Sequence, residues 1–130
     1  MATMIQTQYT AVEALRDVRN LIEAAMQSAD EVNASPFTTF AEQNNGYQSG
    51  ATHLYLKLGD IQIETGESSA LDDFAALVCF MGYADRAARE ALQEFAVIRQ
   101  ASREFYFGKI TAFSQIARLA RVAYEATNAR

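Results

Sequence analysis

Few residues in this chain could carry out chemistry. Its 130 residues include one histidine, His53, and one cysteine, Cys79. A cysteine and a histidine form a nucleophile and base only when the fold brings them together and a third group orients the base. His53 begins one expected element, whereas Cys79 lies within the apolar run 75–81, and no third group is indicated. We therefore predict no catalytic residues and expect Cys79 to pack in the core.

The carboxylates also fail to form a recognisable site. Asp30 and Glu31 are adjacent in sequence, as are Asp72 and Asp73, and adjacent residues do not share a helix face. Histidine and cysteine do not recur with the spacing of zinc ligands, and there is no glycine-rich phosphate loop. We expect no metal, no cofactor and no enzymatic activity, and the sequence gives no indication of a small-molecule substrate.

The charge is divided between the two parts of the chain. Residues 1–85 carry a net charge of −9, whereas residues 86–130 carry +4. On a continuous helix over 86–124, six arginines would lie within an arc of roughly 140°. These are Arg86, Arg89, Arg99, Arg103, Arg118 and Arg121. Guanidinium groups bind phosphate well, so one hypothesis is a small nucleic-acid-binding subunit; the same arginines could instead contact an acidic partner.

The acidic part of the chain supports a further alternative. A strongly negative surface attracts basic partners. The chain could therefore be an acidic inhibitor, of the kind encoded by phages as accessory factors, that occupies a basic site on another protein.

Aromatic residues provide the leading functional hypothesis. Phe105, Tyr106 and Phe107 are consecutive, so on a helix they point in successive directions and cannot all face one core. Aromatic side chains are enriched at the energetic centres of protein interfaces. We predict that these three residues and Phe113 bind a partner. The predicted function is that of a non-catalytic interaction or assembly subunit, bound to another protein or to further copies of itself.

The first elements are helical. Thr10 and Glu13 have the spacing of a capping box, and apolar residues then recur every three or four positions, which predicts a helix over about 9–32. Ser35-Pro36 resembles the start of a short second helix. We expect Asn44-Asn45-Gly46 to end it, because these residues tolerate the left-handed conformation of a helix stop.

A β-hairpin is predicted over about 52–65. Leucine alternates with other residues at 54, 56 and 58, isoleucine follows at 61 and 63, and Gly59-Asp60 suits the turn. Pairing across this turn would place all five apolar side chains on one face. The alternative is a helix over 52–65 that ends at Gly66.

The remaining chain is predicted to be helical. We expect a helix before Gly82 that this glycine breaks, and an apolar pattern over 84–130 that forms one long helix or two helices separated near Gly108. No apolar run approaches the ~20 residues of a membrane span, and the N-terminus does not resemble a signal peptide. The overall expectation is a single domain, 1–130, located in the cytoplasm: a mostly α helical bundle with the hairpin packed on it.

Overall fold

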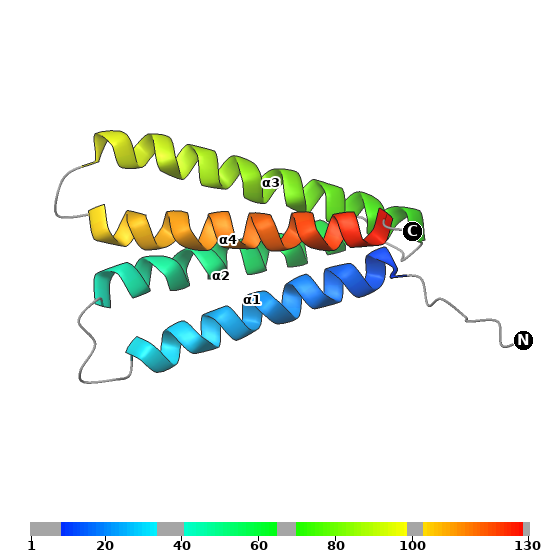
Figure 1. Ribbon diagram of the computed structural model, residues 1–130, viewed down its shortest axis with the longest axis horizontal. Helices are drawn as coiled ribbons and strands as arrows, with labels where there is room; N and C mark the ends of the chain where they lie inside the picture. Colours follow the sequence, from blue (N-terminus) through cyan, green and yellow to red (C-terminus); the bar gives the residue numbers. More distant parts are fainter. Residues whose placement is uncertain (1–8, 34–40, 65–69, 99–102, 129–130) are drawn as a thin grey trace, which may run out of the picture.

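The described residues form four packed helices. The computed structural model describes residues 9–33, 41–64, 70–98 and 103–128. The helices are α1 (Ala11–Asn33), α2 (Ala41–Glu64), α3 (Ala70–Val97) and α4 (Arg103–Asn128). Successive helices run in opposite directions, so α2 and α4 are parallel (Figure 1). The predicted helical bundle is confirmed, and no helix within the described residues is long and apolar enough to cross a membrane.

The capping box at the start of α1 is confirmed. The Thr10 hydroxyl accepts a hydrogen bond from the Glu13 backbone N–H at 3.2 Å, and the Thr10 N–H donates to the Glu13 carboxylate at 3.3 Å. These two bonds satisfy backbone donors that a helix start would otherwise leave unpaired. Leu15, Val18 and Ile22 are buried, as their spacing predicted.

The predicted β-hairpin is wrong. The described residues contain no strand, and positions 52–64 belong to α2, as in the alternative interpretation. Leu54, Leu58 and Ile61 are buried at helical spacing, whereas Leu56 is 60% exposed. The alternating pattern was misleading because Leu56 is a surface residue that happens to separate two core leucines.

Asn44-Asn45-Gly46 does not end a helix, because α2 runs through it. Gly46 is instead a packing position: a Cβ atom there would collide with the backbone carbonyl of Phe105 on α4. A Cβ atom on Gly50, one turn later, would lie only 3.0 Å from the Lys109 carbonyl oxygen. The glycines therefore permit close backbone approach between α2 and α4. The start of the predicted short second helix, at Ser35-Pro36, lies outside the described residues.

Neither of the later glycines breaks a helix. Gly82 lies within α3 and Gly108 within α4, and the two helices are separate because α3 ends at Val97 and α4 begins at Arg103. A Cβ atom on Gly108 would collide with the Gln43 carbonyl of α2. Gly108 therefore allows the same close approach of α2 and α4 from the α4 side. The α2–α4 contact is the most extensive in the bundle and the α2–α3 contact the least. As a result, α4 forms the floor of an opening between α2 and α3.

Candidate functional site

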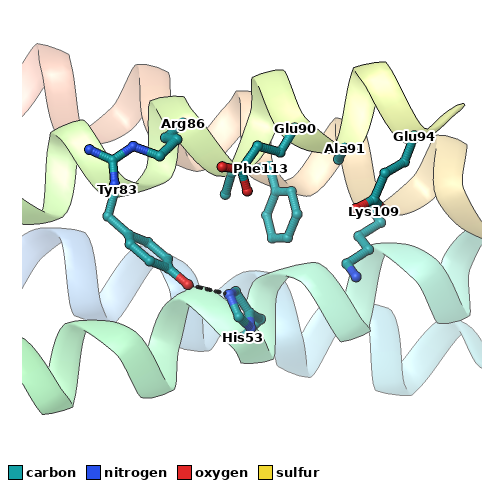
Figure 2. Close-up of a pocket in the computed structure, with 9 residues that line it drawn as sticks. His53, Tyr83, Arg86, Glu90, Ala91, Glu94, Lys109 and Phe113 are labelled. Atoms are coloured by element: carbon teal, nitrogen blue, oxygen red, sulfur yellow. Dashed lines mark hydrogen bonds between the residues drawn. The ribbon is translucent and has the colours of Figure 1, made fainter. Parts of the chain in front are cut away.

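The opening between α2 and α3 contains a cavity lined by both polar and aromatic side chains. Its volume is about 220 Å³. The small side chain of Ala91 on α3 leaves space near the Phe113 ring on α4 (Figure 2). The cavity is lined by His53, Tyr83, Arg86, Ala87, Glu90, Ala91, Glu94, Lys109 and Phe113.

His53 joins α2 to both of the other helices at this site. Its Nε2 atom lies 2.7 Å from the Tyr83 hydroxyl oxygen on α3, the hydrogen bond drawn in Figure 2. The His53 and Tyr83 rings are stacked at 5.8 Å, and Phe113 meets the imidazole edge-on at the same distance. These contacts hold the imidazole at the edge of the cavity, with one nitrogen engaged by Tyr83.

Two lysines lie over aromatic rings around His53. The Lys57 ammonium is 4.8 Å from the centre of the Tyr83 ring, and the Lys109 ammonium is 5.8 Å from that of Phe113 and 5.5 Å from that of Tyr106. Such cation–π contacts are attractive but leave the charge without a counterion. Among the described residues the only ion pair is the one between Arg89 and Asp85, so neither lysine has a carboxylate within 4.0 Å.

These surroundings change two pKa values. Partial burial of the imidazole, and then the charges of Lys109 and Lys57, lower the pKa of His53 below its usual 6.5. His53 is therefore neutral at neutral pH. Burial, followed by the charge of Glu94 and a hydrogen bond to it, raises the pKa of Tyr106 above 10.0. The cavity thus favours a neutral imidazole between two cationic side chains.

Substituting Lys109 is expected to raise the pKa of His53. In Lys109→Gln the closest repulsive charge is gone while the burial remains, so the pKa should move toward 6.5 without reaching it. Lys57→Gln should produce a smaller rise. The pKa of His53 in both variants is measured by NMR from the shift of its ring proton across the acidic and neutral pH range.

Because folding lowers the pKa of His53, the contribution of this residue to stability is present above pH 6.5 and is lost as the pH falls through the pKa of the folded state. A His53 pKa above 6.5, or one unchanged in Lys109→Gln, would contradict this electrostatic account.

Cys79, the one cysteine of the chain, does not line this cavity and so supplies no nucleophile there. Cys79 is exposed on α3, so its predicted core position is wrong. It lies between the buried residues Leu77 and Phe80 in sequence but is turned away from the face that they share. Within the described ranges, no three histidine, cysteine or acidic side chains come close enough to hold a metal ion.

The predicted aromatic surface is dispersed by α4. Phe113 is buried in the core, Phe105 and Tyr106 are half-buried, and Phe107 is 50% exposed. The Phe105 backbone meets Gly46, and Tyr106 faces Lys109 and Glu94. Of the four residues, Phe107 is the most exposed.

The predicted arginine stripe is also divided, since residues 86–124 are not one helix. Arg86 lines the cavity of His53, and Arg89 pairs with Asp85 at 2.7 Å. Arg103 donates to the Phe95 carbonyl at 3.2 Å and lies 4.1 Å from the centre of that ring, which fastens α4 to α3. Arg99 lies outside the described residues.

The last two arginines of the predicted stripe, Arg118 and Arg121, both line a shallow groove between α3 and α4. The groove has a volume of about 250 Å³ and a floor of small residues. We call it the α3–α4 groove; it is lined by Met81, Asp85, Ala88, Ser114, Ala117, Arg118 and Arg121. Asp85, which lines the groove together with Arg118 and Arg121, pairs with Arg89.

Exposed apolar residues continue the α3–α4 groove toward the end where α3 stops and α4 starts. Leu92 follows Ala88 by one turn, and Phe107 precedes Ser114 by two turns, so each extends a helix face that lines the groove. Leu92 is 58% exposed and Phe107 50%. The face therefore has arginines at one end and large apolar side chains at the other.

Sequence reasoning assigned His53 no site role, and it named Arg86 and Phe113 for other roles without bringing the three residues together. Tyr83, Glu90 and Glu94 recur on α3 at intervals of seven and four, so helical spacing alone placed them on one face. What the sequence did not reveal was that α2 is helical at His53 and lies opposite that face. Comparison with protein-family models, with curated proteins and with solved structures found no match.

Proposed function

We propose that this chain is a non-catalytic interaction or assembly subunit, and that its α3–α4 groove binds an acidic, amphipathic helix of a partner protein. One observation carries the proposal: exposed Leu92 and Phe107 lie on the same face as Arg118 and Arg121. Aromatic and arginine side chains contribute most to protein interfaces, and large apolar groups gain most from being covered. The small residues of the groove floor let a helix approach closely.

Charge favours an acidic occupant. Helix α4 has four basic and two acidic residues, whereas each of the other three helices has more acidic than basic residues. The arginines of the α3–α4 groove therefore stand out on a chain whose net charge is −5. Complementary charge speeds encounter and fixes the direction in which a partner lies. A helix with carboxylates at one end and leucines at the other would match both ends of this face.

A second copy of the chain matches the face less well. Twofold pairing places the same patch against itself, so the arginines would oppose other arginines or the apolar end. We therefore favour a different protein as the occupant. A discrete oligomer in light-scattering chromatography that dissociates in Phe107→Ser would contradict this choice and favour self-association.

Nucleic-acid binding has less support from the geometry. Arg103 is bound to Phe95 and Arg86 faces the cavity of His53 instead of the α3–α4 groove, so a phosphate-binding surface would be shorter than the sequence predicted. A strongly salt-dependent complex with RNA or DNA that is lost in Arg118→Glu would reverse this preference.

The proposal is tested with a designed peptide. The probe is a helical peptide of about 18 residues, roughly five turns, with leucines near one end and glutamates near the other. Amide shifts in the protein are expected to cluster around 81–92 and 107–121. Arg118→Glu combined with Arg121→Glu should weaken binding about tenfold or more, because it reverses the attraction at that end.

The matched control is Arg16→Glu, which reverses an exposed charge on α1 and should leave binding unchanged. A peptide with the same composition in scrambled order should bind weakly. Equal binding of the scrambled peptide, or amide shifts centred on α1 and α2, would refute the proposal.

A further inference from the structure

The cavity around His53 has a charge arrangement that the proposed docking face does not use. Glu90 and Glu94 come from α3, while Lys109 extends from α4 toward α2. Figure 2 shows the Glu90 carboxylate on the α3 side of the Phe113 ring, and the Lys109 ammonium and His53 on the α2 side. Opposite charges thus lie on two sides of one aromatic floor.

These charges do not neutralise one another. Within the part of the chain that the structure describes, Lys109 forms no ion pair with Glu90 or Glu94 at 4.0 Å or less. Its ammonium lies instead over aromatic rings. Glu94 acts on the Tyr106 hydroxyl, whose pKa it helps to raise, and Glu90 is an exposed residue of the cavity lining. Charged groups held apart in this way retain their attraction for a ligand with charges of both signs.

The remaining groups limit the ligand further. Phe113 forms an aromatic floor, and the stacked His53 and Tyr83 rings form an aromatic wall. The space of about 220 Å³ is below the range typical for drug-sized ligands. Lys57, one turn after His53 on α2, adds positive charge over the Tyr83 ring, so the carboxylate of a ligand is favoured on the His53 side and its ammonium near Glu90 and Glu94.

We propose that this cavity binds a small zwitterion with an aromatic or apolar body, the chemistry of a free amino acid. Its ammonium lies between the carboxylates of Glu90 and Glu94. Its carboxylate lies near Lys109 and the His53 imidazole, and its body packs on Phe113. This small-molecule site is separate from the α3–α4 groove, because the two sets of lining residues have no member in common.

The test uses three probes with the same ring. They are L-phenylalanine, phenylacetate, which lacks the ammonium, and phenethylamine, which lacks the carboxylate. Phenylalanine is expected to give saturable NMR shifts at His53, Tyr83 and Phe113 at millimolar concentration or below. Each of the other two probes should bind at least about tenfold more weakly than phenylalanine, since each loses one of the two charge contacts. The His53 pKa should rise when phenylalanine binds, because a carboxylate then stands beside the imidazole.

Two variants assign the ends of the ligand. Lys109→Gln should weaken the binding of phenylalanine about tenfold and leave that of phenethylamine nearly unchanged. Glu90→Gln should weaken the binding of phenylalanine to the same extent and leave that of phenylacetate nearly unchanged. Glu104→Gln, an exposed acid on α4 that does not line the cavity, is the matched control. Phenylacetate binding as tightly as phenylalanine would establish a simple anion site instead. An absence of saturable shifts with phenylalanine at tens of millimolar would overturn the proposal outright.

Discussion

Gly46→Ala and Gly108→Ala are each expected to lower the free energy of unfolding by about 3 kcal/mol, the upper end of the usual cost of overpacking a core. In both cases the new methyl group meets the backbone of the facing helix rather than a side chain that could turn aside. The α2–α4 pair must then move apart, which disturbs the most extensive contact of the bundle. Urea unfolding followed by circular dichroism measures the loss.

Gly82→Ala is the matched control for both variants. It lies inside α3 with no atom within 4 Å of the new Cβ, so the higher helix propensity of alanine should raise stability by about 0.5–1 kcal/mol. Glycine-to-alanine substitution thus changes the free energy of unfolding in opposite directions, depending on whether the glycine contacts another helix. Stabilisation by Gly46→Ala of the size seen for Gly82→Ala would show that α2 and α4 are not closely packed there.

Leu58→Ala is expected to cost about 3 kcal/mol, whereas Leu56→Ala should change stability by less than about 0.5 kcal/mol. Leu58 is fully buried between helices, and its truncation leaves a cavity, while Leu56 is 60% exposed. The hairpin predicted from sequence would have placed both leucines on the same buried face. Equal and large losses for the two variants would therefore favour strands over the observed helix.

Local signals in this sequence predicted local structure well. The Thr10–Glu13 capping box and the apolar spacing of Leu15, Val18 and Ile22 depend on residues within a few turns of one another, and the structure confirms them. The hairpin failed because two core leucines with one surface leucine between them fit either period. Only the burial supplied by α4 and α1 distinguishes them.

Glycines were the other source of error. Gly46, Gly82 and Gly108 were each interpreted as a helix stop or a possible one, but all three lie inside helices. Two of them meet the backbone of a helix about sixty residues away in the chain, a contact that no local pattern encodes. The candidate sites were hidden for the same reason. His53 and Glu90 line one cavity only because α2 and α3 flank α4, and the arginine stripe assumed one continuous helix where there are two.

A charge-swap experiment determines whether Arg118 and Arg121 set the charge preference of the α3–α4 groove. The acidic helical peptide and its counterpart with lysine in place of glutamate are each titrated into the parent protein and into Arg118→Glu/Arg121→Glu, at low and physiological salt. The account predicts that the parent protein prefers the acidic peptide and that the double variant prefers the basic one, with the difference reduced by salt. An unchanged preference in the double variant would contradict the claim that these two arginines determine what this face binds.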